Sequence, residues 1–193
     1  MKGMESMNNI LDWMEYAKAA RQMVAEGCVL LKNDDKVLPL NKGERISIFG
    51  RIQSDYYKSG TGSGGMVNTP YVVSIPEGLK NSGSVIINEE LEAVYDAWTR
   101  ENPFDQGVGW AQEPWCQKEM PLTEEVVGKA ASKSDAAIII LGRTAGEDKD
   151  NSATEGSFLL TKEEEAMLSI VCRHFPKTVV VLNVGNIIDM KWV

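Results

Sequence analysis

The chain has 193 residues, of which 43% are hydrophobic and 25% are charged, and its formal net charge at pH 7 is -8. These values indicate a globular protein with room for one sizeable core, and they exclude a disordered or fibrous chain. The acidic balance excludes a nucleic-acid partner, because phosphate binding depends on clustered Lys and Arg and the sequence has no basic run.

No segment approaches the length of a membrane span, and the N-terminal stretch MKGMESMNNILDWMEYAKAARQ lacks the apolar core of a secretory signal. We therefore expect no membrane partner and a cytoplasmic location. The three cysteines, Cys28, Cys116 and Cys172, are widely spaced and form no CxxC pair, which predicts reduced thiols and gives no metal motif. The sequence predicts neither a cofactor nor a metal ion.

The first half of the chain alternates helical and strand-like stretches. Apolar residues at three- and four-residue steps predict an amphipathic helix over residues 13–31. The run RISIFG at 45–50 predicts a buried strand, and the Gly-, Ser- and Tyr-rich stretch 51–71 predicts a long loop of functional interest. A short helix at 76–80 and a strand at 84–88 are expected to follow.

The second half continues the same alternation. A helix at 89–100 leads into an irregular insert at 101–122, after which Thr123 is placed to cap a further helix. DAAIIILG at 135–142 is the most strand-like run of the chain, and an acidic loop follows it.

The last predicted helix begins at Thr161 and ends near His174, and Thr161 and Glu164 have the spacing of a capping box. A strand at 178–185 follows. Four continuous apolar runs separated by helices predict an α/β fold, a three-layer α/β/α sandwich with a mostly parallel sheet. The chain stops at NIIDMKWV, where another helix is expected, so we expect the domain to be truncated at its C-terminus.

The stretch GTGSGG satisfies the G-x-G-x-x-G pattern through Gly60, Gly62 and Gly65. A dinucleotide fingerprint must sit at the tight turn between a strand and a helix. Here ten residues separate the pattern from the strand end at Phe49, and no helical sequence follows. A closely packed glycine loop is therefore the better interpretation.

A calcium loop is excluded by its own spacing rules. Asp148, Asp150 and Ser152 match the first three ligand positions, but Ala153 stands where glycine is required and Leu159 stands where a bidentate Glu is required. The sole histidine, His174, lies at a helix end, where a positive charge suits the helix dipole, so we expect it to cap the last turn.

The insert ENPFDQGVGWAQEPWCQ carries the aromatic residues Phe104, Trp110 and Trp115. Aromatic faces in such a segment either stack on sugars or bases, or anchor the insert to the body of the domain. The sequence leaves both possibilities open.

The acidic loop GRTAGEDKDN, residues 142–151, begins at a strand end, where ligands of parallel α/β sheets bind. The three acids Glu147, Asp148 and Asp150 are expected to raise one another's pKa, because like charges disfavour ionisation. A raised carboxyl pKa is what a general acid needs near neutrality. The alternative is a solvated acidic loop with no chemical role.

Taken in order, several segments resemble the α/β sandwich domain of glycoside hydrolase family 3, the β-glucosidase and β-xylosidase family. The matching segments are residues 25–40, 45–50, 59–70, 136–151, 159–168 and 178–190. The resemblance implies a hydrolase in which a (β/α) barrel carries an aspartate nucleophile and this domain supplies a glutamate as general acid/base.

Carried over to this sequence, the resemblance places the acid/base role on Glu147, with Glu155 as the runner-up. It leaves Arg143 and Asp148 as loop supports or as substrate-binding partners of sugar hydroxyls. The implied chemistry is retaining hydrolysis of a β-linked glucoside or xyloside oligosaccharide.

On this interpretation residues 1–193 form a partial sandwich domain from a family member in which that domain precedes the barrel. The missing barrel domain of the same polypeptide is then the main partner, and the fragment alone is expected to be inactive. The alternatives are a non-catalytic carbohydrate-binding or interaction module of the same fold and, more remotely, a nucleotide-binding domain.

Overall fold

The computed structural model describes residues 12–193, so the expectation about an N-terminal signal falls in part on residues 1–11, outside the described range. The described chain divides into two units, one ending at Lys36 and the other spanning Val37–Val193. Each unit is described by itself. No helix within residues 12–193 is long and apolar enough to cross a membrane.

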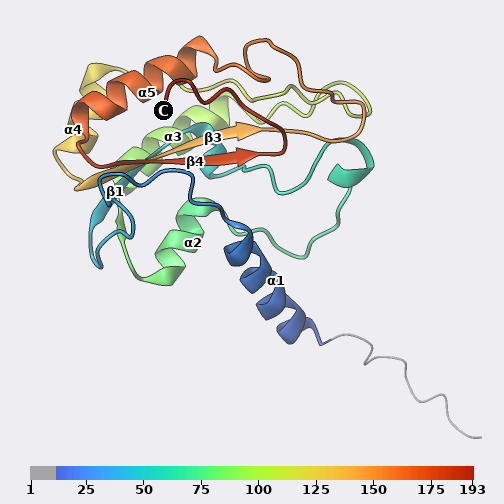
Figure 1. Cartoon of the computed structure of the whole chain (residues 1–193), viewed down its shortest axis with the longest axis horizontal. Coiled ribbons are helices and arrows are strands. Elements are labelled where there is room, and N and C mark those ends of the chain that lie inside the picture. Colours follow the sequence, from blue (N-terminus) through green and yellow to red (C-terminus); the bar gives the residue numbers. More distant parts are fainter. Residues whose placement is uncertain (1–11) are drawn as a thin grey trace, which may run out of the picture. The chain divides into compact units, whose positions relative to one another are not determined.

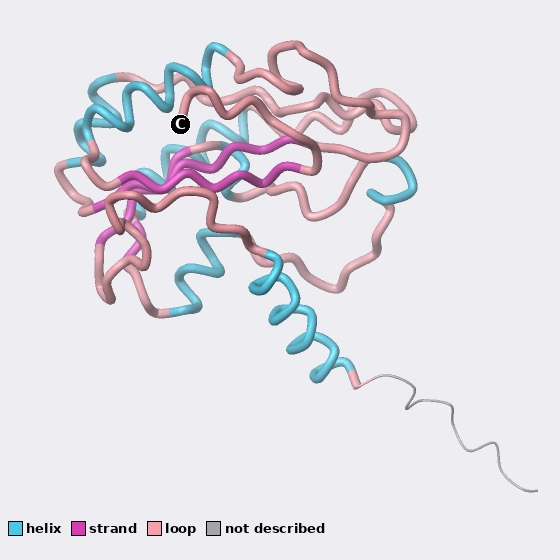
Figure 2. Tube along the Cα trace, in the orientation of Figure 1, coloured by secondary structure: helices cyan, strands magenta, loops and turns pink. Residues whose placement is uncertain are grey.

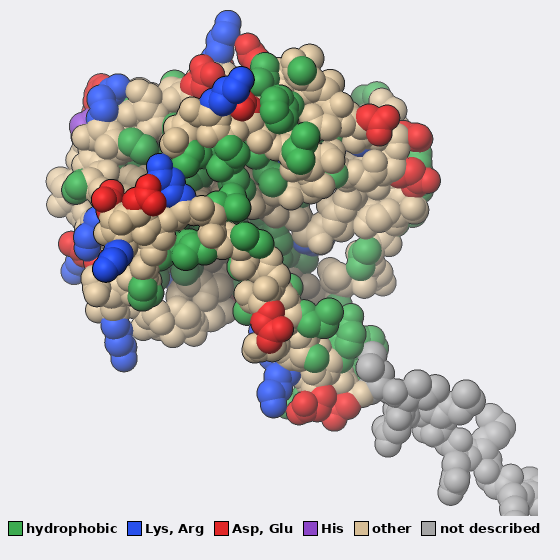
Figure 3. Space-filling view, in the orientation of Figure 1, with side chains coloured by type: hydrophobic (Ala, Val, Ile, Leu, Met, Phe, Trp, Pro, Cys, Tyr) green, Lys and Arg blue, Asp and Glu red, His purple; other side chains and the backbone are tan. Residues whose placement is uncertain are grey.

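The first unit contains helix α1, Trp13–Gly27, which ends four residues earlier than its apolar pattern predicts. The side chain of Asp12 caps its start by accepting hydrogen bonds from the backbone N–H groups of Met14 and Glu15. The helix ends at Gly27 because glycine is a poor helix former, and the next residue is already extended. None of its residues is buried, and its apolar side chains are visible on the surface of the helix (Figure 3).

The second unit is built on a sheet of four parallel strands in the order β2-β1-β3-β4 (Figures 1 and 2). The strands are β1 Arg45–Phe49, β2 Ile86–Ile87, β3 Ala136–Arg143 and β4 Thr178–Val184. Every residue of β3 is buried because this strand lies between two others and is covered on both faces. Continuous Ile and Val runs suit such a position, as the sequence predicted.

Helices cover both faces of this sheet and make it the middle layer of three (Figure 1). The helices of this unit are α2 Ile75–Ser82, α3 Glu89–Glu101, α4 Glu124–Ala131 and α5 Lys162–His174. Ile139 and Leu141 of β3 pack in the core shared with α3, α4 and α5, whereas Ile138 and Ile140 pack in the core shared with α2. Because alternate residues of a strand point to opposite faces, one apolar run fills both cores. The predicted three-layer α/β/α fold is confirmed.

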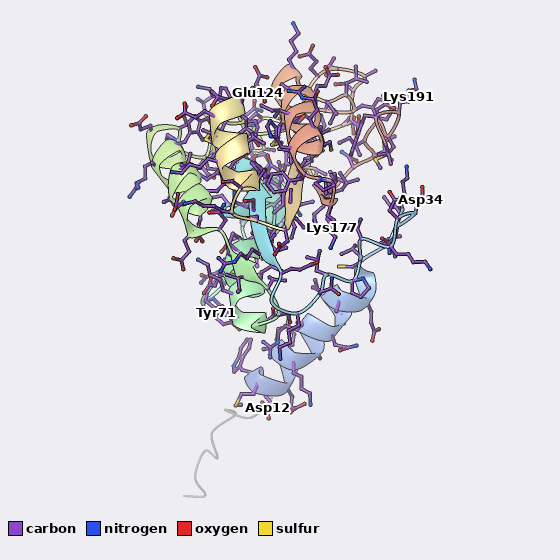
Figure 4. The ribbon with its side chains drawn as sticks, turned by 90° about the vertical axis from the view of Figure 1, so that its left-hand side faces the viewer. Asp12, Asp34, Tyr71, Glu124, Lys177 and Lys191 are labelled. Atoms are coloured by element: carbon purple, nitrogen blue, oxygen red, sulfur yellow. The ribbon has the colours of Figure 1, made fainter. Side chains whose placement is uncertain are left out.

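The predicted caps at the starts of α4 and α5 are also confirmed. The hydroxyl of Thr123 accepts a hydrogen bond from the N–H of Val126 at the start of α4, and Thr161 and Glu164 form a complete capping box at the start of α5. The cap expected from His174 at the end of α5 is not seen within residues 12–193: its Nε2 lies 2.6 Å from Oε2 of Glu124, which Figure 4 labels on the adjacent helix α4, and the helix end is closed by the backbone N–H of Phe175.

Candidate functional site

The loops that the sequence singled out gather at one end of the sheet, beyond the carboxyl ends of β1 and β3 (Figure 2). They are the glycine-rich loop after β1, the insert at 101–122 and the acidic loop after β3. Ligands of open parallel sheets bind at this edge, so this is where a site is expected.

The acidic loop turns sharply just after β3. The N–H of Lys149 donates to the carbonyl of Gly146 at 3.2 Å, which closes a four-residue turn with Glu147 and Asp148 at its two central positions. Asp148 has a φ of +55°, a left-handed conformation that aspartate tolerates better than most residues. The turn places both central side chains at the protein surface.

The glycine-rich loop is docked on the acidic loop. The N–H of Thr61 donates to the carbonyl of Ala145 at 2.7 Å, and its hydroxyl donates to the carbonyl of Glu147 at 3.2 Å. A Cβ at Gly60 would lie 2.7 Å from the carbonyl oxygen of Ala145, and a Cβ at Gly62 would lie 2.6 Å from Cβ of Glu147. The closely packed glycine loop is thus confirmed, and its partner is the acidic loop.

Ser63 of the glycine-rich loop holds the Glu147 carboxylate. Its backbone N–H lies 2.9 Å from Oε2 of Glu147, and its hydroxyl lies 2.7 Å from the same oxygen. These two donors, the backbone N–H first, hold the pKa of Glu147 below its ordinary value, because hydrogen bonds to the charged form favour it. The expectation that the neighbouring acids raise this pKa is therefore wrong for the isolated chain.

Arg143 lies inside the protein, at the base of the same loop. Its side chain is 1% exposed, and its two terminal nitrogens contact the two carboxylate oxygens of Glu164 at 2.6 and 2.7 Å. Its other hydrogen bonds go to the backbone carbonyls of Gly142, Ser157 and Leu159. These contacts join the end of β3 to the connection that follows it and to α5, and they leave the guanidinium of Arg143 buried.

Glu155, the runner-up for the acid/base role, lies in the same connection between β3 and α5. It is exposed, and its backbone forms an isolated bridge with Leu159. Its carboxylate has no hydrogen bond within residues 12–193, in contrast to that of Glu147.

The aromatic insert is anchored at two points and exposed at a third. Phe104 packs edge-on against Tyr57, with 5.8 Å between ring centroids, and the ammonium of Lys149 lies 5.2 Å from the ring centroid of Trp115. Trp110 is 53% exposed. Phe104 and Trp115 therefore anchor the insert to the body of the domain. The Trp110 side chain is exposed to solvent.

The insert also carries a buried carboxylate that the sequence analysis did not single out. Glu119 is 7% exposed and accepts hydrogen bonds from the backbone N–H groups of Arg51 and Met120. Burial raises its pKa to about 7. No sequence pattern marks this residue, whereas Ser63 was detectable as a hydroxyl inside the glycine motif.

A pocket of about 580 Å³ lies between the glycine-rich loop, the insert and the start of α2. Its lining includes Tyr57, Phe104 and Glu113, together with Thr144, the residue that follows β3. The pocket thus adjoins the acidic loop. Within residues 12–193 no group of three or more His, Cys, Asp or Glu side chains is arranged to hold a metal ion, and the three cysteines are free.

The described geometry can be compared with known proteins. The family model described as "Glycosyl hydrolase family 3 C-terminal domain" matches residues 28–193. The chain belongs to glycosyl hydrolase family 3. Its acidic loop and glycine-rich loop both lie inside the matched region.

Curated relatives of this family member are β-glucosidases. A β-glucosidase of Ruminococcus albus is 54% identical over 183 residues, which cover 95% of this chain and 19% of that protein. β-Glucosidase A of Butyrivibrio fibrisolvens is 35% identical, over 92% of this chain and 24% of its own length. The chain thus spans about a fifth to a quarter of the curated relatives it matches.

Solved structures agree with these matches. The crystal structure of a β-glucosidase from Paenibacillus barengoltzii has a TM-score of 0.91 and 54% identity, covering 94% of this chain and 20% of that one. β-Glucosidase 3B of Thermotoga neapolitana, solved in complex with α-D-glucose, has a TM-score of 0.81 and 32% identity, over 93% of this chain and 25% of its own. The family 3 glycosidase domain inferred from the sequence is therefore confirmed, and it matches only a part of each of these longer homologues.

Proposed function

We propose that this chain supplies the acid/base half of a retaining β-glucosidase active site, with Glu147 as the general acid/base. The substrate is a β-linked glucoside or xyloside. The nucleophile, an aspartate, comes from a barrel domain that is not part of these 193 residues. The chain alone is then inactive, because it holds only one of the two carboxylates.

The observation that carries this proposal is the setting of Glu147. Its side chain is exposed at the carboxyl end of the sheet, yet its backbone and its carboxylate are both hydrogen-bonded to the glycine-rich loop. An exposed acid on an ordered turn can meet a substrate held by a facing domain. A merely solvated carboxylate needs no such fixation, and Glu155 has none.

The reaction requires Glu147 to donate a proton in the first step and to accept one in the second. In the first step it protonates the leaving glycosidic oxygen while the aspartate attacks the anomeric carbon; in the second step it removes a proton from the attacking water. The two carboxyl groups of a retaining enzyme lie about 5–5.5 Å apart. Approach of a second carboxylate and exclusion of water both raise the pKa of an acid, so assembly of the site offsets the lowered pKa of Glu147 in the isolated chain.

The competing function is a carbohydrate-binding or interaction module that keeps the fold without the chemistry. The polar pocket beside the acidic loop is the feature that favours it. On that account Glu147 is dispensable for catalysis, and the pocket binds sugar in the isolated chain.

A chimera separates these functions. The matching segment of the Ruminococcus albus β-glucosidase, which is 54% identical over 183 residues, is replaced by this chain. Glu147→Gln and Glu155→Gln are then compared on an alkyl β-glucoside, whose leaving group needs a proton, and on dinitrophenyl β-glucoside, whose leaving group does not.

We expect Glu147→Gln to lower kcat/KM on the alkyl glucoside by about 100- to 10,000-fold and to affect the dinitrophenyl glucoside much less. Glu155→Gln should leave both rates near those of the unmodified chimera. The opposite pattern would transfer the acid/base role to Glu155. An active chimera in which neither substitution discriminates between the leaving groups would favour the module.

A further inference from the structure

We propose that Ser63 is a positioning residue for Glu147: it holds carboxylate oxygen Oε2 with two donors and leaves Oε1 as the oxygen that exchanges the proton with the substrate. This inference rests on the acid/base role proposed above. The contact between Ser63 and Glu147 is nevertheless a property of the two loops and is measurable without catalysis.

Both donors of Ser63 meet the same oxygen. The backbone N–H lies at 2.9 Å and the hydroxyl at 2.7 Å from Oε2 of Glu147, distances typical of hydrogen bonds to a charged acceptor. Two donors on one oxygen resist rotation of the carboxyl group. The other oxygen therefore has a defined direction even though the side chain is exposed.

The backbone around this contact is fixed on both sides. Thr61 donates its N–H to the carbonyl of Ala145 and its hydroxyl to the carbonyl of Glu147. The two loops are therefore joined at Thr61, two residues before Ser63. At Gly62, the residue between them, the chain has a φ of +68° and approaches Cβ of Glu147 too closely for a side chain. Thr61 thus bonds the backbone of the acidic loop, and Gly62 leaves space for Glu147 to approach. Ser63 then donates two hydrogen bonds to the Glu147 carboxylate.

Two hydrogen bonds to one carboxylate oxygen suit Glu147, which must act first as an acid and then as a base. In the first step the proton on Oε1 passes to the leaving oxygen as the glycosidic C–O bond breaks, and the carboxylate that results is stabilised by Ser63. In the second step water attacks the anomeric carbon, the bond to the aspartate breaks, and the water proton returns to Oε1. Ser63 keeps Oε2 in place through both transfers and favours the ionised form that the second step needs.

The contact is tested on the 193-residue chain by following the Glu147 side-chain carboxyl carbon by NMR from acid to neutral pH, with Glu147→Gln to assign the signal. We expect Ser63→Ala to raise the pKa of Glu147, because it removes one donor to the charged form. Ser63→Thr retains a hydroxyl and should keep the unmodified titration. Ser59→Ala, on the same loop, is the matched control and should leave it unchanged.

The positioning role is tested on the active chimera through the pH profile of kcat/KM on an alkyl β-glucoside. The basic limb of such a profile reports the pKa of the general acid in the free enzyme. Ser63→Ala should move this limb to higher pH, because an acid with a raised pKa keeps its proton longer, and should lower kcat more than it changes KM. A merely structural role would lower the plateau without moving the limb.

The contact and the positioning role can fail separately. An unchanged Glu147 titration in Ser63→Ala would overturn the contact, and a shifted titration with an unmoved pH profile would overturn the positioning role. If Glu147→Gln leaves the chimera fully active, the acid/base assignment fails, while the NMR titration still reports on the contact by itself.

Discussion

Two charged side chains of the acidic loop, residues 142–151, lie four residues apart in opposite surroundings. Arg143 is 1% exposed and is paired with Glu164, which is 5% exposed, at the base of the loop. Glu147 is exposed at the tip and is held by a serine of another loop. The base is fixed by a buried ion pair and the tip by hydrogen bonds at the surface.

The difference shows how one short loop combines rigidity with access. The guanidinium of Arg143 connects the end of β3, the carbonyls of the following connection and the first turn of α5. Because these three segments share one buried group, the turn that carries Glu147 starts from a fixed point. The exposed Glu147 carboxylate can then keep a defined position in solvent.

Breaking the base of the loop should have the largest effect on stability. Arg143→Met leaves the Glu164 carboxylate buried without its cation, and removing one partner of a buried pair costs about 3–5 kcal/mol. We expect a loss of this size in the free energy of unfolding, measured by urea denaturation of the 193-residue chain.

An exposed arginine–glutamate pair gives the matched control for this loss. Arg173 pairs with Glu124 at the surface, so Arg173→Ala should change the free energy of unfolding by at most about 1 kcal/mol. The double variant Arg143→Met/Glu164→Gln should recover part of the loss, because glutamine also serves in a capping box. Equal effects of Arg143→Met and Arg173→Ala would contradict a structural role for the buried pair.

Glu119 is buried as Glu164 is, but within residues 12–193 it has no side-chain ion pair. Burial raises the pKa of Glu119 to about 7 in the folded protein from 4.5. A raised folded-state pKa means that the folded chain holds the Glu119 proton more tightly than the unfolded chain does. The protonated Glu119 therefore contributes its full share to the free energy of unfolding below pH 4.5, and this share is lost as the pH rises to about 7. The loss should be on the order of 3 kcal/mol.

Glu119→Gln tests this dependence, because the amide is neutral at every pH. The free energy of unfolding of the unmodified chain should fall, relative to that of Glu119→Gln, between about pH 4.5 and 7, and the difference should then level off. Parallel curves for the two proteins across that range would show that the Glu119 pKa is not raised.

A smaller loss of stability is expected in the glycine-rich loop next to Glu147, where two glycines of one motif differ in their surroundings. Gly62 has a φ of +68°, and an added Cβ would meet Cβ of Glu147 at 2.6 Å, whereas an added Cβ at Gly64 would meet nothing within 4 Å. Gly62→Ala should cost about 1–2 kcal/mol for its left-handed backbone alone, and it should displace Glu147. Gly64→Ala should change the free energy of unfolding by less than about 0.5 kcal/mol, because Gly64 lies at the surface with open space around it.

Unfolding by urea measures both glycine variants, and the Glu147 NMR titration reports the displacement. In Gly62→Ala the titration should move toward that of Ser63→Ala, because both changes weaken the same contact. If Gly64→Ala proved as costly as Gly62→Ala, the docking of the glycine-rich loop would be wrong.

The sequence by itself determined the parts of this protein that depend on local pattern. Apolar runs gave the four strands, caps such as Thr123 and Thr161 gave the helix starts, and the order of the segments gave the glycoside hydrolase family. The helix from Trp13 was predicted too long because its apolar steps continue past Gly27, where the backbone preference of glycine ends the helix. Patterns of this kind are readable because they act over a few neighbouring residues.

The tertiary structure alone decided which side chains meet. Glu147 and Ser63 are 84 residues apart in sequence, and Arg143 and Glu164 are 21 apart. No spacing rule links either pair, since the sheet brings the ends of separate strands together. The pKa of a carboxyl group follows from these meetings: three neighbouring acids suggested a raised pKa at Glu147, but hydrogen-bond donors from a distant loop lower it.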